Sequence, residues 1–343
     1  MRILNKWLKL GTTMCAATLL SASVMAAEKP QTWRIQTLWQ PGTLTQQAFE
    51  RFAANVNQKT DGGIKIIPLP AGAVVGVNET FDAVRRGILQ GQHPAVVYWS
   101  GKDPAFAVLG DLNGAYDDPR DAEEYFYEHG GLELLREAYR PHGLFPIGVV
   151  WWGAESLPAT RRVDTPEALS GLKIRLPQGM SSDLLSKFGA VPVNLPGSEV
   201  FSALDSGTIE STDWGVLSMN DELGFHDRAK FAIYPGIHST PAGDVSIPLK
   251  TWERLSPETQ ALLEEAVREF GRDLRDSLEQ ADKEVAAKLK DKGVELIDWS
   301  PEDRLRFRNA AIEVWQSYGK QNDLAKRAVD GQIEFLRSKG LIN

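Results

Sequence analysis

Segments that favour strand and segments that favour helix alternate along this chain, and this alternation restricts its fold more than any other feature. From residue 33 onward, the pattern favours strand, helix, strand, helix and strand in turn, over 33–38, 44–56, 64–69, 78–87 and 94–99. Each pair is separated by a short turn. Alternation with short turns predicts an α/β fold with a mainly parallel sheet.

A second unit with the same alternation begins near Trp151. The segments that favour helix or strand are 165–169, 172–176, 181–188, 191–194, 198–204 and 209–214. A length of 343 residues indicates two domains. No low-complexity linker separates the units, so we expect several crossing strands to join them.

The character changes at Ser256-Pro257, a strong helix start. Apolar residues then recur at three- and four-residue spacing as far as Lys292, which predicts one long amphipathic helix or two helices with a break near Gly271. A further helix is expected from Pro301 to about Tyr318. The charged faces of these helices are interpreted as a solvated outer layer.

The first 26 residues have the composition of a secretory signal peptide. Three basic residues precede an uncharged stretch over 10–26, and small residues at Val24 and Ala26 suit cleavage after Ala26. The alternative, an uncleaved anchor, is disfavoured because the apolar stretch is short for a bilayer. The sequence therefore predicts a periplasmic protein.

Charge and cysteine content exclude several classes of function. The chain holds 46 acidic against 38 basic residues, so neither nucleic acid nor an anionic membrane is expected as a partner. The single cysteine, Cys15, lies in the predicted signal peptide and leaves no thiol chemistry to the mature chain. No phosphate-binding loop, dinucleotide fingerprint, Gly-x-Ser-x-Gly or His-Glu-x-x-His motif is present.

The central stretch carries a family resemblance. The sequences at 165–175 (TPEALSGLKIR), 188–193 (FGAVPV) and 199–210 (EVFSALDSGTIE) resemble the signature region of the solute receptors of tripartite ATP-independent periplasmic (TRAP) transporters, the DctP-type family. The segment at 98–105, with Asp213-Trp214 and Tyr234-Pro235-Gly236, resembles the branch that binds 2-oxo or 2-hydroxy acids with a cation.

The resemblance implies a two-lobed, periplasmic-binding-protein-like α/β fold, with a hinge and a long helix that crosses both domains. Lobe I would comprise residues 27–152 and about 241–280, lobe II 153–240 and about 281–318, and a C-terminal helical extension 319–343. The implied partners are a small organic acid and the membrane permease of the transporter. In this branch the C-terminal helices sometimes form a homodimer.

Arg175 is the residue we expect to hold the acid. It ends a predicted strand just before the turn at Pro177, and open α/β sheets bind ligands outside their strand ends. A guanidinium can hold one carboxylate with two parallel hydrogen bonds. The resemblance also places Arg175 at the carboxylate clamp; the alternative is a surface arginine paired with an acid.

Glu155, Asp213 and Trp214 are the expected cation ligands, with Trp214 acting through its backbone carbonyl. The resemblance places a polar cation ligand at Glu155. Two carboxylates, one guanidinium and a monoanionic acid sum to two negative charges, which a divalent ion would neutralise. Oxygen ligands then favour calcium, with sodium as the alternative. In the competing interpretation, the two carboxylates are simply solvated.

Aromatic residues at predicted strand ends are expected to form the walls of the site. Trp99 is the preferred wall residue because it ends the predicted strand 94–99. The other candidates are Trp39, Tyr98, Trp151 and Trp152. His238 is expected to form a hydrogen bond with the second polar group of the ligand.

These residues favour a receptor for a small monocarboxylate over an enzyme. One alternative is a receptor for another organic acid, such as a sugar acid or an aromatic acid, without a metal. A further alternative is a hydrolase or lyase that uses Glu155 and Asp213 as acid and base.

Overall fold

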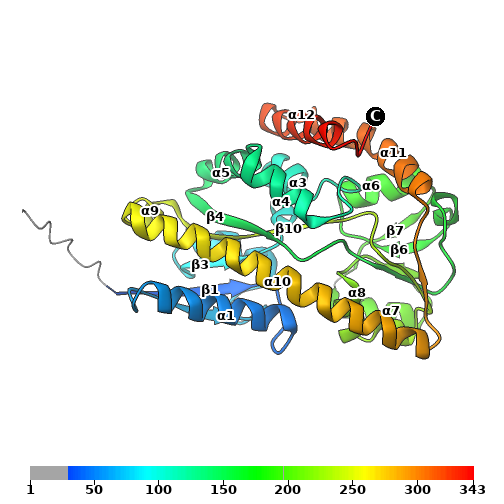
Figure 1. Ribbon diagram of the computed structural model, residues 1–343, viewed down its shortest axis with the longest axis horizontal. Helices are drawn as coiled ribbons and strands as arrows, with labels where there is room; N and C mark the ends of the chain where they lie inside the picture. Colours follow the sequence, from blue (N-terminus) through cyan, green and yellow to red (C-terminus); the bar gives the residue numbers. More distant parts are fainter. Residues whose placement is uncertain (1–29, 196) are drawn as a thin grey trace, which may run out of the picture.

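The computed structural model describes residues 30–195 and 197–343 as two β-sheets with helices packed around them (Figure 1). The predicted signal peptide, residues 1–26, lies outside the described residues. None of the helices in the described ranges is long and apolar enough to cross a bilayer. The α/β fold class predicted from the sequence is confirmed.

The first sheet has five described strands in the order β2-β1-β3-β10-β4. β1 pairs in parallel with β2 and β3, whereas β10 runs antiparallel to β3 and β4. The strands are β1 (Gln31–Thr37), β2 (Ile64–Leu69), β3 (Gly91–His93), β4 (Leu144–Trp151) and β10 (Ala242–Pro248). Every residue of β4 is buried, as expected for an apolar strand covered on both faces.

Helices from separate parts of the chain cover the first sheet. They are α1 (Leu44–Lys59), α2 (Thr80–Arg85), α3 (Ala105–Gly110), α4 (Pro119–Glu128), α5 (Gly131–Tyr139) and α9 (Leu249–Trp252). The Thr43 side chain caps α1 by accepting a hydrogen bond from the backbone amide of Gln46. Phe49 and Phe52 of α1 then pack into a core shared with β1 and β10.

The second sheet has six described strands in the order β11-β9-β5-β8-β6-β7. They are β5 (Leu157–Ala159), β6 (Lys173–Arg175), β7 (Val191–Val193), β8 (Ser211–Thr212), β9 (Phe231–Ile233) and β11 (Glu295–Ile297). The nearby helices are α6 (Met180–Lys187), α7 (Val200–Asp205) and α8 (Leu217–Glu222). Each sheet with its helices forms one lobe, which we call lobe I and lobe II in chain order.

One strand in each sheet runs against its neighbours, and the crossings between the lobes explain this. β5 follows β4 directly through residues 152–156, and β10 follows β9 through residues 234–241. A strand that arrives from the other lobe enters its sheet from the hinge side, so it runs antiparallel to its neighbours. The sequence predicted crossing strands but not this reversal, so each sheet is less parallel than expected.

A single helix, α10 (Pro257–Asp291, 35 residues), runs past both sheets. It contacts α1 and β4 in lobe I and α8 and β11 in lobe II. It has no break at Gly271, where a Cβ atom would lie 3.1 Å from Val150 Cγ1, so the glycine allows the helix to pack closely on β4. Of the two alternatives, one continuous helix is correct.

The C-terminal helices α11 (Pro301–Gly319) and α12 (Asp323–Ser338) pack back over the two lobes (Figure 1). α11 contacts both α6 of lobe II and α3 of lobe I, whereas α12 contacts α3 and α5 of lobe I. The sequence predicted a helix from Pro301 to about Tyr318, which agrees with the observed bounds of α11. The exact domain boundaries stay a prediction.

Candidate functional site

A cleft of about 920 Å³ opens between the two lobes. Its lining includes Trp39 and Tyr98 from lobe I, and Arg175 and Trp214 from lobe II. Glu155 and the residues around it close the cleft at the hinge. The cleft therefore lies where the sequence placed the ligand, outside the strand ends.

Arg175 is the last residue of β6 and lies in this cleft. Its Nη1 donates a hydrogen bond to the backbone carbonyl of Asp213 at 2.6 Å, and its Nε donates to that of Leu195 at 3.3 Å. The guanidinium carbon lies 5.4 Å from the centre of the Trp214 ring. Within 30–195 and 197–343 no carboxylate forms an ion pair with Arg175, so a fixed positive charge faces the cleft without a protein counter-ion.

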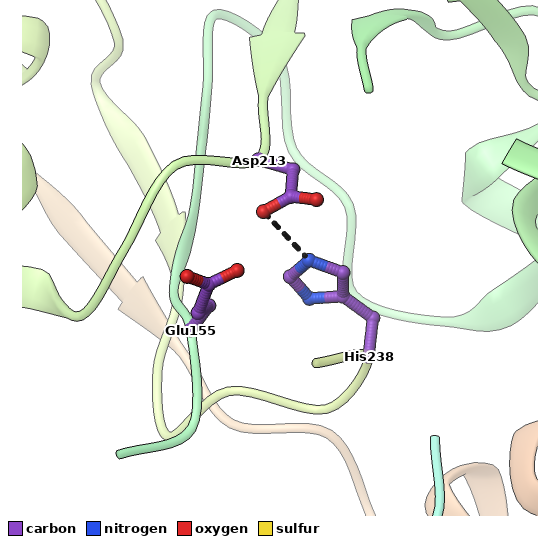
Figure 2. Close-up of side chains that lie close together, drawn as sticks. All are labelled: Glu155, Asp213 and His238. Carbon is purple, nitrogen blue, oxygen red and sulfur yellow. Dashed lines mark ion pairs between the residues drawn. The ribbon is translucent and has the colours of Figure 1, made fainter. Parts of the chain in front are cut away.

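Glu155, Asp213 and His238 converge at the hinge end of the cleft (Figure 2). Each offers a ligand atom within 4.8 Å of the others. Glu155 lies on the crossing from β4 to β5, Asp213 follows β8, and His238 lies on the crossing from β9 to β10. Both carboxyl side chains are only 5% exposed, and His238 is completely buried. The interpretation that the two carboxylates are simply solvated by bulk water therefore does not fit their burial.

The pKa values of the two carboxyl groups are shifted in opposite directions. Burial raises the pKa of Glu155 well above its usual range, and the Asp213 charge raises it further. Burial also opposes ionisation of Asp213, but His238, a hydrogen bond from Glu155 and the Arg175 charge together hold its pKa below its usual value. The proton shared by this buried pair is therefore held more tightly by Glu155 than by Asp213.

Trp152, one of the expected wall residues, and Ser239, which the sequence did not single out, hold Glu155 in place. Trp152 Nε1 lies 3.2 Å from Glu155 Oε1, and Ser239 Oγ lies 2.9 Å from Glu155 Oε2. Ser239 Oγ also lies 2.6 Å from Asp111 Oδ2. A hydroxyl has one hydrogen, so a protonated Glu155 can donate to Ser239 while Ser239 donates to Asp111. No motif marks Asp111 or Ser239, because their partners are distant in sequence.

The prediction that Trp99 forms a wall of the cleft is wrong. Trp99 is 1% exposed, and its ring centre lies 5.0 Å from that of Phe81 in the core of lobe I. Residues 96–99 form a 3-10 turn instead of the predicted strand. The turn directs the Trp99 ring into the core and leaves Tyr98, which is 40% exposed, to line the cleft.

The other predicted wall residues divide between cleft and core. Trp39 and Trp152 line the cleft and contact each other edge to face, with ring centres 5.1 Å apart. Trp151 is buried against Phe126 in the core of lobe I. Adjacent residues on an extended strand point to opposite faces, so only one of the two tryptophans 151 and 152 can face the ligand.

His238 does not line the cleft, contrary to the expected contact with the ligand. Its Nε2 lies 3.4 Å from Asp213 Oδ1, and the dashed line in Figure 2 marks this ion pair. The ring therefore orients Asp213 from behind. The Trp214 ring lines the cleft beside Arg175, and its backbone carbonyl as a cation ligand stays a prediction.

Two lobes around a cleft with a fixed guanidinium define the class of extracellular solute-binding proteins. Residues 35–322 match the DctP family, described as bacterial extracellular solute-binding protein, family 7. The match covers most of the chain, so this protein belongs to that family. Its members are receptors of TRAP transporters, which confirms the prediction of a receptor and excludes the hydrolase and lyase alternatives.

Individual relatives agree with this assignment. The chain is 26% identical over 329 residues to the monocarboxylate 2-oxoacid-binding periplasmic protein of Nostoc sp., covering 93% of this chain and 88% of that protein. It is 35% identical to a TRAP periplasmic solute-binding protein of Rhodobacter sphaeroides, solved in an apo open state. That alignment covers 91% of this chain and 99% of the other, with a TM-score of 0.80.

Two further solved structures contain a cation. A TRAP solute-binding protein from Pseudoalteromonas atlantica, solved with sodium and pyruvate, is 25% identical, with a TM-score of 0.78 and coverage of 91% and 96%. One from Bordetella bronchiseptica, a dimer with calcium and picolinate, is 24% identical, with a TM-score of 0.82 and coverage of 91% and 93%. At this identity the second likeness shows the fold alone.

Proposed function

We propose that this protein captures a small 2-oxo or 2-hydroxy monocarboxylate together with a cation, and delivers it to the membrane permease of a TRAP transporter. The observation that carries the proposal is the convergence of an unpaired guanidinium, Arg175, and two buried carboxyl groups on one cleft. The acid's carboxylate binds Arg175, and Glu155 and Asp213 hold the cation. The Nostoc relative, named for 2-oxoacid binding, supports this substrate class.

The charges of the site support calcium as the cation. With Glu155 and Asp213 ionised, Arg175 positive and a monoanionic acid bound, these four groups sum to two negative charges, which calcium neutralises. The available protein ligands are mostly oxygen atoms, and calcium accepts irregular oxygen cages. Calcium is the proposed ion and sodium the alternative.

The cation explains why the acid should carry a second oxygen beside its carboxylate. A 2-oxo or 2-hydroxy group and one carboxylate oxygen can bind the same ion as a chelate. An acid without that oxygen would lose one bond to the cation while Arg175 still holds its carboxylate. The proposed receptor therefore prefers pyruvate over propionate.

A thermal-melt panel tests the proposal. We expect pyruvate with calcium to raise the melting temperature of chelator-treated protein, because a ligand that binds only the folded state stabilises it. Propionate with calcium, and pyruvate with chelator, serve as controls and should give smaller shifts. Equal shifts with and without cation would contradict the role of the cation.

A metal-free receptor for a sugar acid or an aromatic acid is the alternative function. The cleft volume of about 920 Å³ favours it, since a three-carbon acid fills only a small part of that space. In the same panel, a glucuronate or benzoate shift that is insensitive to chelator would support this alternative.

The cellular setting follows from the family and from the leader sequence. We propose export to the periplasm with cleavage after Ala26, and docking of the ligand-bound receptor on the permease. A ligand that contacts both lobes binds the closed state better and shifts the population toward it. We also propose a homodimer through the C-terminal helices; light scattering of the purified protein tests this state.

A further inference from the structure

The hinge holds a third buried carboxyl group, Asp111, which the proposed function does not use. Asp111 follows α3 in lobe I and is 8% exposed. Its oxygens have three hydrogen-bond partners: Asn113 Nδ2 at 2.7 Å, Ser239 Oγ at 2.6 Å and the backbone amide of Thr240 at 3.1 Å. Both oxygens of Asp111 therefore have protein donors.

Ser239 connects this carboxyl to the cation site. Its Oγ lies 2.9 Å from Glu155 Oε2, and its backbone carbonyl accepts a hydrogen bond from the Glu155 amide at 2.9 Å. On the other side, Trp152 Nε1 holds Glu155 Oε1. Ser239 has one hydrogen, which it can donate to Asp111 or to Glu155. When Glu155 is ionised to hold a cation, Ser239 donates to Glu155 Oε2, and each oxygen of Glu155 keeps a lone pair for the cation. The orientation of Glu155 is thus set by Ser239 and Trp152.

Asp111 also fixes the segment on which Ser239 lies. That segment, residues 234–241, is one of the crossings between the lobes, and it meets the chain after α3 through a hydrogen bond from the Gly114 amide to the His238 carbonyl at 2.8 Å. Because Asp111 binds both the Ser239 side chain and the Thr240 backbone, it holds the segment that places His238 beside Asp213. One carboxyl therefore supports both proposed cation ligands.

Asp111 is not itself a member of the cation cluster. Within the described residues, the group of side chains that could hold a metal consists of Glu155, Asp213 and His238. Since both oxygens of Asp111 already have hydrogen-bond partners in the protein, Asp111 supports the ligands instead of binding the ion. Groups that orient metal ligands in this way typically alter metal affinity about 10- to 100-fold when removed.

We propose that Asp111 and Ser239 are positioning residues that orient Glu155 for the cation and link cation binding to the hinge. This inference rests on the proposed function, because it requires Glu155 to be a cation ligand. The cation affinity of the receptor then depends on the hydrogen bonds of Asp111 and Ser239 as well as on the cation ligands themselves. At saturating cation, the affinity for the acid should depend much less on these hydrogen bonds.

Calcium titration by calorimetry, on chelator-treated protein with saturating pyruvate, tests the proposal. Ser239→Ala and Asp111→Asn should each weaken calcium binding about 10- to 100-fold. Pyruvate affinity at saturating calcium should stay within about threefold of wild type, a split that a merely structural role would not produce. Ser239→Thr keeps the hydroxyl and should restore most of the calcium affinity.

Asp244→Asn is the matched control, since Asp244 is a fully buried acid in β10 outside the cluster. It should leave calcium affinity unchanged. The proposal is overturned if folded Ser239→Ala binds calcium within about twofold of wild type, or loses calcium and pyruvate affinity equally. If Asp111→Asn does not fold, Ser239→Ala decides. Wild type that binds no calcium would instead refute the proposed function.

Discussion

The two ends of the cleft are built differently. At the hinge end, Glu155, Asp213 and Ser239 are almost completely buried and held by side-chain contacts. At the outer end, Tyr318 lines the cleft, is only half-buried and is tied to Asp183 of lobe II by a 2.7 Å hydrogen bond. The comparison suggests a rigid end that recognises the part shared by all 2-substituted acids, and an adaptable end that meets their tails.

The largest effect on binding is expected at Arg175. Arg175→Ala removes up to two charged hydrogen bonds to the acid, so affinity should fall at least tenfold and by about 100-fold if both are lost. Calorimetry with pyruvate and calcium measures the change. Arg162→Ala, at an exposed ion pair of lobe II, is the control and should bind normally. An Arg175→Ala variant with wild-type affinity would remove the basis for the carboxylate clamp.

Removing one charge at the hinge end should have the next largest effect. Asp213→Asn keeps the backbone carbonyl that accepts from Arg175 but removes a proposed cation ligand. We expect pyruvate affinity in calcium to fall about tenfold or more, and to become insensitive to chelator. Asp205→Asn, at an exposed aspartate paired with Arg228, is the control. A variant that still responds to chelator would argue against Asp213 as a ligand.

The outer end should discriminate between acids by size. Tyr318→Ala should change pyruvate affinity less than about threefold, because a short acid stays at the hinge end. It should weaken 4-methyl-2-oxovalerate about three- to tenfold, since the branched tail loses an apolar contact. Competition assays on the same protein compare the two acids, and Tyr318→Phe, which keeps the ring, should behave like wild type. Equal losses for both acids would contradict the proposed division of the cleft.

A buried acid outside the cleft should affect stability without affecting binding. Burial raises the pKa of Asp244 to about 7, against a usual value near 4, while Tyr139 donates a 2.8 Å hydrogen bond to its Oδ1. The native state therefore keeps a proton that the unfolded chain has lost, so stability falls as pH rises from about 4 to about 7 and then levels off.

Asp244→Asn should remove this fall in stability with rising pH and leave pyruvate affinity unchanged. On going from pH 4 to pH 8, the free energy of unfolding of the variant should rise by about 1 to 4 kcal/mol relative to that of wild type. Urea unfolding at both pH values measures the difference. A parallel pH dependence in the two proteins would show that Asp244 is ionised in the native state.

Much of the fold followed from local sequence patterns. The helix start at Ser256-Pro257 and the regular apolar spacing after it predicted α10, and the strand that ends at Arg175 placed this residue at the cleft. The resemblance brought Glu155 and Asp213 to one place, and their ligand atoms lie within 4.8 Å of each other in the cluster with His238. Their roles in cation binding stay predictions.

The errors arose where tertiary contacts decide the orientation of a side chain. Local pattern could not tell that residues 96–99 turn instead of extending, so Trp99 was preferred over Tyr98 as the wall residue. Asp111 and Ser239 are 128 residues apart, and nothing in either local sequence indicates their hydrogen bond. Such pairs can be identified only from the tertiary structure, because the crossings between the lobes bring the two residues together.

The exchange of strands between the sheets has a consequence for how this chain reaches its native state. β10 completes the first sheet between β3 and β4, yet it is synthesised only after most strands of the second sheet. Neither lobe can therefore mature while the other is absent, and a cut at the hinge should not release two stable halves. Contacts so distant in sequence also predict slow folding.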